Sequence, residues 1–325
     1  MPSTWESPSG HSRCAGGAPN VTTRAAAVGG LIEPIRLPSL SQLLLLGLIW
    51  GVGMVAIKVA LKDLPPLTLA AIRSGTAGVA LGGYAWLAGE HLRLPLRGGV
   101  LLPLTAFTAT YAANIALLHL GMVMTSAGRA TVLFFTQPVW VTFLSPWVLH
   151  EERLTGGRVL GIVLAFSGFV VVFLPEVGGE QPIVVGDLLV TAGAVCWAFT
   201  TLSLRRTMAF VSPTTATFWQ MAGATPILLA LGLGLEGPLA YRLSPATAMA
   251  LAYLAVGHIA FGFVLWGALI RRHGPAAVSS FLFLVPLFSV LIGFVFLGEV
   301  PTGPLLVGAA LIAAGIVLTS RTPVA

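Results

Sequence analysis

The stretch WGVGMVAIKVALKDLPPLTLAAIRSGTA, residues 50–77, has a second copy in WAFTTLSLRRTMAFVSPTTATFWQMAGA, residues 197–224. The two copies align without a gap at an offset of 147 residues, and the same offset relates residues at the far end of each half. The equivalent pairs are Trp50 and Trp197, Lys58 and Arg205, Pro66 and Pro213, Arg73 and Gln220, Glu152 and Glu299, Gly161 and Gly308, and Gly168 and Gly315. We therefore expect two halves of the same fold.

The composition indicates a membrane protein. Of the 325 residues, 56% are hydrophobic and 9% are charged, whereas soluble domains are about 25% charged. The net charge of +6 does not indicate a nucleic-acid partner, because the cations are scattered between apolar segments and form no stripe. The two cysteines, Cys14 and Cys196, have no metal-ligand spacing. We expect no metal or other cofactor.

Ten apolar segments are long enough to cross the bilayer as helices, which takes about 20 residues each. They are residues 39–60, 67–88, 99–120, 126–149, 157–175, 187–204, 213–235, 246–269, 275–297 and 303–320. Since each half has five spans, an odd number, the second half must enter the bilayer from the opposite side. The sequence thus predicts an all-α membrane protein with ten transmembrane helices, arranged as two inverted five-helix repeats. The repeats cover residues 39–175 and 187–320, after a disordered tail over residues 1–38.

The distribution of Lys and Arg predicts the orientation. With the N-terminus inside, twelve of the seventeen cations fall on the inner side, two on outer loops and three within spans. Because cytoplasmic loops carry an excess of Lys and Arg, we expect both termini in the cytoplasm. The protein would then be a multi-pass protein of the cell (inner) membrane. The oligomeric state does not follow from the sequence.

Two longer segments carry a family resemblance. AGRATVLFFTQPVWVTFLSPWVLHEERLT, residues 127–155, has its second copy in AAVSSFLFLVPLFSVLIGFVFLGEVPT, residues 276–302. Each contains a Pro-then-Glu-then-Thr pattern, formed by Pro138, Glu152 and Thr155 and by Pro286, Glu299 and Thr302. With the Trp50-Gly51 opening and the spacing from Pro66 to Arg73, these segments resemble the EamA-type carriers of the drug/metabolite transporter superfamily.

The resemblance covers residues 39–320 and has two departures. The distance from Pro to Glu is 14 residues in the first copy and 13 in the second, so the copies slip by one residue. His258 also stands where the family usually has a small or hydroxyl residue. Membership in this family implies export or exchange of small organic metabolites, often amino acids, without fixing the substrate.

Pro138 and Pro286 lie near the middle of spans four and nine, at equivalent places in the two halves. A proline removes a helix hydrogen bond, and paired interruptions of this kind indicate a substrate site in transporters. A packing kink is the alternative. Gln137 and Trp140 flank Pro138 and could supply a hydrogen bond and a flat binding wall. We include all four residues in the predicted substrate site.

Buried polar side chains supply the other candidates. Tyr111 and Asn114 are three residues apart on one helix face, which we expect to point inward, either to bind substrate or to join helices. Arg73 lies inside span two, where it could attract an anionic substrate group, extend to the membrane surface, or pair with Asp63. His258 lies at the centre of span eight and is the one embedded group expected to titrate near neutral pH. It could bind substrate or couple protons, or be satisfied by a neighbouring backbone group or by Ser279 or Ser280. Trp266 and Ser280 complete the predicted set.

Other features favour packing. Gly161, Gly168, Gly308 and Gly315 recur at seven-residue spacing, which predicts close contact between helices. No Asp or Glu is expected to be buried in the middle of a span. This disfavours proton exchange for cationic drugs and favours zwitterionic or anionic solutes.

Three functions are weighed. The first is an alternating-access exporter or exchanger of a small metabolite such as an amino acid. A carrier for sugar phosphates or nucleotide sugars would need several cations in its cavity, and the sequence offers Arg73 and Lys58. An intramembrane enzyme would need paired acids, a Ser–His pair or a metal set at mid-depth. Because Asp187 has no partner Asp and His258 stands alone, we expect no enzyme activity.

Overall fold

The computed structural model describes residues 36–95, 99–149, 156–173, 181–238, 243–274, 278–298 and 300–321. The regular structure in these ranges is helical, and they contain no β-strand. Of the tail predicted over residues 1–38, residues 1–35 lie outside the described part of the chain. So do Glu152, Thr155 and Glu299 of the Pro-Glu-Thr patterns, and the side chain of Ser280.

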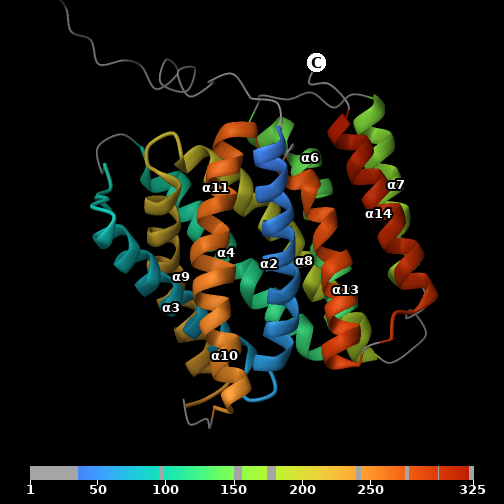
Figure 1. Ribbon diagram of the computed structural model, residues 1–325, viewed down its shortest axis with the longest axis horizontal. Coiled ribbons are helices and arrows are strands. Elements are labelled where there is room, and N and C mark those ends of the chain that lie inside the picture. The colour runs from blue at the N-terminus through green and yellow to red at the C-terminus, as the bar shows by residue number, and fades with distance from the viewer. Residues whose placement is uncertain are drawn as a thin grey trace, which may run out of the picture. The chain divides into compact units, whose positions relative to one another are not determined.

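The helices follow the predicted spans closely (Figure 1). Those of the first half are α2 (Leu37–Ala60), α3 (Pro66–Leu87), α4 (Leu101–Met124), α5 (Ala127–Phe134), α6 (Gln137–Val148) and α7 (Gly156–Phe173). Those of the second half are α8 (Gln181–Thr207), α9 (Pro213–Leu235), α10 (Pro245–Tyr253), η2 (Leu254–Phe261), α11 (Gly262–His273), η3 (Ser280–Phe283), α13 (Leu284–Leu297) and α14 (Gly303–Arg321).

Five helical segments of the described ranges are long and apolar enough to cross a membrane. They are Leu37–Ala60, Leu101–Met124, Val184–Thr207, Pro213–Leu235 and Pro245–His273. Shorter apolar helical stretches run over Val159–Gly168, Phe288–Leu297 and Gly303–Gly315. The count of ten spanning helices stays a prediction.

Proline and serine set where several helices begin. Pro66, Pro213 and Pro245 each occupy the first turn of a helix, where the missing N–H costs no helix hydrogen bond. Ser212 and Ser244 precede α9 and α10, and each side chain accepts a hydrogen bond from a backbone N–H of the first turn. Such caps satisfy donors that the helix leaves open.

Spans four and nine are both interrupted just before their prolines. Span four is divided into α5 and α6, and Pro138 stands in the first turn of α6. Span nine changes from α-helix at residues 278–279 to the 3₁₀-helix η3, and Pro286 follows near the start of α13. The predicted interruptions are therefore present. The break precedes each proline, because a proline fits the first turn of a new helix better than a helix interior.

Span eight contains a feature that the sequence did not predict. Its middle, η2, is a π-helix that includes His258. π-Helical turns are rare and occur frequently at functional sites.

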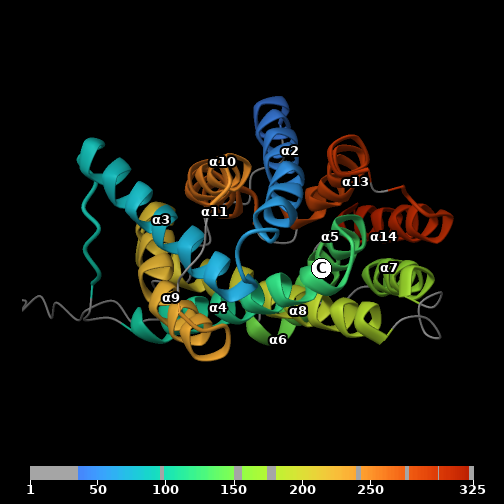
Figure 2. The ribbon, with the colours of Figure 1, turned by 90° about the horizontal axis from the view of Figure 1, so that it is seen from below.

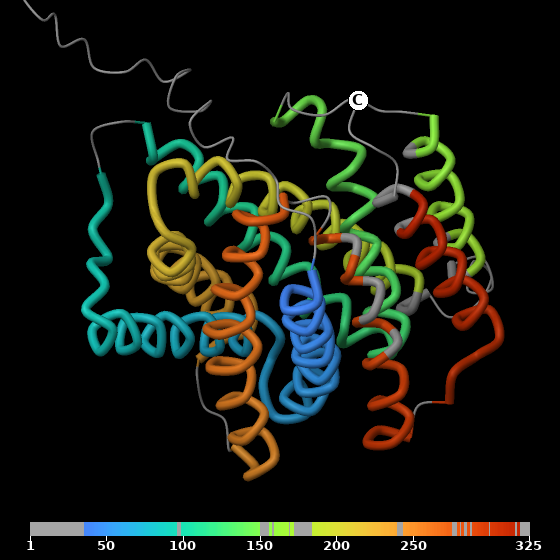
Figure 3. The backbone as a smooth tube through the Cα atoms, turned by 45° about the horizontal axis from the view of Figure 1, so that its top comes forward, coloured from blue at the N-terminus to red at the C-terminus, as the bar shows by residue number. Residues whose placement is uncertain are grey.

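Equivalent helices of the two halves pack side by side and run antiparallel (Figure 3). A Cβ added at Gly168 of α7 would lie 2.6 Å from the carbonyl oxygen of Gly308. One added at Gly315 of α14 would lie 2.5 Å from the carbonyl oxygen of Gly161. These contacts confirm the close packing predicted for the four glycines. Because position 161 meets 315 and position 168 meets 308, α7 and α14 run in opposite directions.

Helices α3 and α9 show the same relation. Gly75 lies against Thr225, Gly82 against Phe218, and Gly232 against Thr68. As the residue number rises along α3, the number of its contact residue on α9 falls, so the two helices run antiparallel. In Figure 2, α2 lies between α10 and α13, opposite α4 and α8. The main hydrophobic core, which includes Trp50 and Trp197, lies between these two groups.

Candidate functional site

A small cavity lies inside this core. Its water-accessible volume is about 20 Å³, room for about one water molecule. Helices of both halves contribute to its wall. The described lining residues are Trp50, Met54, Arg73, Asn114, Ile115, Leu118, Phe134, Phe135, Trp197, His258 and Phe263. Three of the predicted site residues, Arg73, Asn114 and His258, are therefore brought together.

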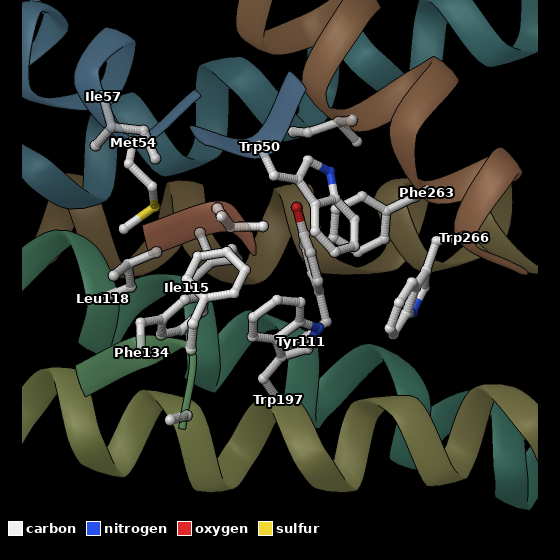
Figure 4. Packing of buried hydrophobic residues seen from close by; sticks show 14 of the residues in the cluster. Trp50, Met54, Ile57, Tyr111, Ile115, Leu118, Phe134, Trp197, Phe263 and Trp266 are labelled. Atoms are coloured by element: carbon white, nitrogen blue, oxygen red, sulfur yellow. The ribbon is translucent and has the colours of Figure 1, made fainter. Parts of the chain in front are cut away.

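Aromatic rings form most of the apolar wall (Figure 4). Trp197 is stacked on Phe134 with ring centroids 4.7 Å apart and contacts Phe135 edge to face. Trp50 lies 5.6 Å from Phe263 and 5.2 Å from Trp266. Such ring pairs gain about 0.5–1.5 kcal/mol beyond their area burial. The apolar part of the wall is therefore built mainly from aromatic rings packed against one another.

Arg73 is the cation of this wall. It is 0% exposed, and its Nη1 donates to Nε2 of His119 at 3.1 Å. By distance and angle Nε and Nη2 have no hydrogen-bond partner among the described residues, and the Tyr111 hydroxyl lies close enough to the guanidinium to interact with it. The alternatives of surface extension and pairing with Asp63 are wrong. Arg73 is fully buried, and the Asp63 carboxylate accepts hydrogen bonds from the backbone N–H of Ser244 and the hydroxyl of Thr247.

His119 is a second embedded histidine, which the sequence analysis did not predict beside His258. It is fully buried on α4, and its Nδ1 lies 2.7 Å from the carbonyl oxygen of Ile115. A carbonyl oxygen can only accept, so Nδ1 carries the proton and Nε2 accepts from Arg73. The hydrogen bond to Ile115 is local, because the two residues are four apart on one helix. The contact with Arg73 has no counterpart in the sequence.

Asn114 and His258 add polar atoms to the cavity wall. Asn114 is 1% exposed, and its Oδ1 has no partner among the described residues. His258 is 8% exposed, and its Nδ1 likewise lacks one. The predicted alternative of a serine partner for this nitrogen is absent from the described side chains. Tyr111 faces inward as predicted, with its hydroxyl 3.3 Å from Oγ of Ser74 and its ring against Phe263.

The other predicted site residues lie outside the set that lines the cavity. Gln137 is fully buried, and its Nε2 donates to the hydroxyl of Thr201 at 2.8 Å. Trp140 donates to the hydroxyl of Thr136 and packs near Val141 on α6. The remaining three are Pro138 and Pro286, which are buried, and Trp266, which supports the Trp50 ring from behind.

One carboxylate is buried near the start of a predicted span. Helix α8 begins at Gln181, six residues before the predicted span, so Asp187 lies inside the helix and is 0% exposed. It forms an ion pair with Arg129 and accepts from the hydroxyl of Thr125. Because Asp187 lies near the start of α8, the expectation that no acid is buried in the middle of a span stays a prediction. Asp187 is not among the lining residues, so the described cavity wall still has no carboxylate.

Polar contacts also join the halves at the loops. The Glu236 carboxylate accepts from the backbone N–H groups of Leu67 and Thr68 at the start of α3. Hydrogen bonds from Ser244 and Thr247 lower the pKa of Asp63 to about 2. These contacts hold the α2–α3 and α9–α10 loops of the two halves against each other.

The chemistry available in the cavity is recognition. The described wall offers a cation with two open donors, two open polar atoms on Asn114 and His258, and aromatic surface. No cluster of His, Cys, Asp or Glu that could hold a metal occurs among the described residues.

Comparisons with known proteins agree with this arrangement. The model of the EamA-like transporter family matches residues 37–174 and again residues 184–321. The chain is 30% identical to the uncharacterized transporter YvbV of Bacillus subtilis, over 88% of this chain and 93% of that protein. It is 31% identical to a probable amino-acid metabolite efflux pump of Salmonella typhimurium, over 84% and 91%.

The fold also matches a solved structure. A crystal structure aligns with a TM-score of 0.65 and 20% sequence identity, covering 86% of this chain and 95% of that one. The family match covers both halves of the sequence and nearly all of its described helices. The chain is therefore a multi-pass membrane protein and belongs to the EamA-like transporter family.

Proposed function

We propose that the protein is a secondary-active, alternating-access carrier that exports or exchanges a small organic metabolite such as an amino acid. The observation that carries this proposal is the small cavity between helices of both halves, in whose wall two donors of Arg73 are buried without a hydrogen-bond partner among the described residues. The space present holds about one water. A metabolite therefore needs the helices around it to move, as alternating access requires.

The family and its relatives support the direction of transport. The Salmonella relative is described as a probable amino-acid metabolite efflux pump, and the chain covers nine-tenths of its length. The antiparallel contacts of α3 with α9 and of α7 with α14 support two inverted repeats over residues 39–175 and 187–320. We place both termini in the cytoplasm. Reporter fusions at each terminus test this, and reporters active on opposite sides would refute it.

The sugar-phosphate alternative is weakened by the charges of the cavity. Among the described lining residues, Arg73 is the one Lys or Arg. Lys58, the second cation considered, donates to the carbonyl oxygens of Met122 and Thr125. A phosphorylated solute carries about two negative charges and would call for more positive charge than this wall supplies.

The enzyme alternative has no constellation to carry it. Asp187, the one buried acid of the described residues, is neutralised by Arg129 instead of facing a second carboxylate. His258 and His119 line or support the cavity without a neighbouring nucleophile or metal cluster in the described part of the chain.

A metabolite profile tests the proposed function. Cells that overexpress the chain are compared with cells expressing the Arg73→Gln variant at equal membrane abundance. We expect one or a few small zwitterionic or anionic metabolites to rise in the medium and fall in the cytosol with the parent chain only. Identical profiles for both chains and for cells without either would contradict the proposal.

A further inference from the structure

The open polar atoms of the cavity define which solute fits, and the argument rests on the proposed function. Arg73, Asn114 and His258 are each more than nine-tenths buried, and each has at least one polar atom without a hydrogen-bond partner among the described residues. A buried polar group without a partner destabilises the protein, and a charged one does so more strongly. Three such groups in one cavity indicate that a ligand supplies their partners.

We propose that this cavity is a receptor for the two charged groups of an α-amino acid, with the carboxylate on Arg73 and the ammonium on Asn114 and His258. Nε and Nη2 of a guanidinium point in nearly the same direction and can hold both oxygens of a carboxylate. These are the two open donors of Arg73. The third nitrogen, Nη1, is already bound to His119.

The acceptors complete the head group. Oδ1 of Asn114 is an acceptor, and Nδ1 of His258 is one in the tautomer that protonates Nε2. An ammonium has three donors and no acceptor, so these two atoms suit it. The described lining contains no carboxylate that would compete for Arg73 or neutralise it. A free amine or a dianion would leave part of this set without a partner.

The rest of the wall selects the side chain. Met54, Ile115, Leu118 and Phe134 have apolar side chains, and the indole N–H of Trp50 already donates to the carbonyl oxygen of His258. A polar side chain would lose its water here without compensation. The solute class is therefore α-amino acids with apolar or aromatic side chains.

His119 is a positioning residue in this receptor. Its Nδ1–H is held by the Ile115 carbonyl, which leaves Nε2 as an acceptor for Arg73 Nη1. This hydrogen bond fixes the guanidinium with Nη1 turned away, so that its other edge remains for the carboxylate. His119→Leu removes the acceptor, whereas His119→Gln keeps a side-chain oxygen that can accept.

Binding to the purified, full-length protein in lipid nanodiscs tests the receptor. The probes are L-leucine and L-phenylalanine, each with its deaminated and decarboxylated counterpart. These are 4-methylpentanoate and 3-methylbutylamine, and 3-phenylpropanoate and 2-phenylethylamine. We expect each missing charge to weaken binding at least about tenfold, the effect of one lost charge-assisted hydrogen bond.

Variants assign each charge to its partner. With Arg73→Gln, the amino acid and its decarboxylated amine should bind within about threefold of each other, since the carboxylate has lost its partner. With Asn114→Leu, the difference in affinity between the amino acid and its deaminated acid should likewise fall to about threefold or less. His119→Leu should reduce the difference in affinity between the amino acid and its decarboxylated amine, and His119→Gln should restore part of that difference. Thr225→Ser, a change on α9 outside the lining residues, is the matched control and should leave both differences unchanged.

The result that would overturn the inference is a flat series, in which acid, amine and amino acid bind the folded parent chain equally. Absence of binding by both amino acids to that folded chain would overturn it as well. If the metabolite profile then shows export of another solute, this inference fails while the proposed function stands. If the profile shows no export, the proposed function fails too. Equal monodispersity of parent and variants excludes misfolding as the cause.

Discussion

The indole rings of Trp50 and Trp197 meet edge to face, with their centroids 5.5 Å apart. These two residues occupy the same position in the two copies of the repeat, 147 residues apart. Equivalent residues of two related halves touch only near the axis that relates them. Both tryptophans line the cavity, so the cavity lies where the two halves meet.

Replacing Trp197 should disrupt this junction. Trp197→Ala removes the stacked contact with Phe134 and the edge contact with Trp50. Large-to-alanine changes at buried aromatics cost about 3–5 kcal/mol. We expect the midpoint of thermal unfolding in detergent to fall clearly. The control is Trp147→Ala on α6, whose ring is 56% exposed and whose loss should leave the midpoint nearly unchanged. Equal midpoints for both variants would contradict the placement of Trp197 in the core.

Gly53 is required by the His258 ring. A Cβ at Gly53 would lie 1.8 Å from Cδ2 of His258, so the Gly53→Ala variant forces the ring out of its place. We expect solute flux in proteoliposomes to fall at least about tenfold, because a displaced binding group loses a charge-assisted contact. Gly83→Ala is the matched control, since a Cβ there meets nothing within 4 Å. Normal flux in the Gly53→Ala variant would exclude His258 from the transport path.

Gly315 keeps α7 and α14 in contact. Its added Cβ would meet the Ala165 backbone nitrogen and the Gly161 carbonyl oxygen at 2.5 Å, and backbone atoms cannot turn aside. We expect Gly315→Ala to lower the free energy of unfolding by about 1–3 kcal/mol, as overpacking does. Gly303→Ala, on the same helix with open space around it, should not. Because these helices lie away from the cavity lining, the KM of the remaining transport should stay unchanged, and a raised KM would argue otherwise.

The ion pair of Arg129 and Asp187 should stabilise the fold mainly because each charge prevents the other from being buried without a partner. Asp187 is fully buried and the Arg129 side chain is 12% exposed. Removing one partner of a buried pair costs about 3–5 kcal/mol, whereas apolar replacement of both costs far less. A double-mutant cycle with Asp187→Leu and Arg129→Met measures this by thermal unfolding. We expect the double variant to be more stable than Asp187→Leu alone. Additive losses would show that the two groups do not interact.

Asp63 should make stability depend on pH in acid. Its pKa in the folded protein is about 2, below the ordinary 3.8, because Ser244 and Thr247 donate hydrogen bonds to the carboxylate. A lowered folded pKa adds stability that is full above the unfolded pKa and lost as the pH falls through the folded one. The loss should therefore develop between about pH 5 and pH 2. In the Asp63→Asn variant the midpoint of thermal unfolding should fall less between about pH 5 and pH 2 than in the unchanged protein. An equal fall in both proteins would contradict this role of Asp63.

The sequence predicted features that follow from local periodicity. Span positions, the interruptions near Pro138 and Pro286, and the contacts of Gly168 and Gly315 depend on hydropathy, ring geometry and small size. Inward-facing Asn114 followed from the cost of an amide in an apolar environment. Each of these is a property of one helix or of one repeated pattern.

The sequence could not predict contacts between distant helices. The partnership of Arg73 with His119 joins α3 to α4, and neither residue type nor spacing encodes it. His258, which lies in the π-helix η2, has its ring against Gly53 of α2, about two hundred residues away in the chain. Asp187 stands at the start of the predicted span 187–204, and its ion pair with Arg129, which lies in the other half, is encoded neither by residue type nor by spacing.

Counterflow in proteoliposomes tests the central claim, a saturable carrier built around one shared cavity, most directly. Vesicles are preloaded with an excess of the unlabelled solute that the metabolite profile identifies, and labelled solute is added outside. The account predicts a transient accumulation of label above equilibrium, saturation with solute concentration, and loss of both with Arg73→Gln. Label that only equilibrates, at a rate proportional to concentration and equal in the variant, would contradict it.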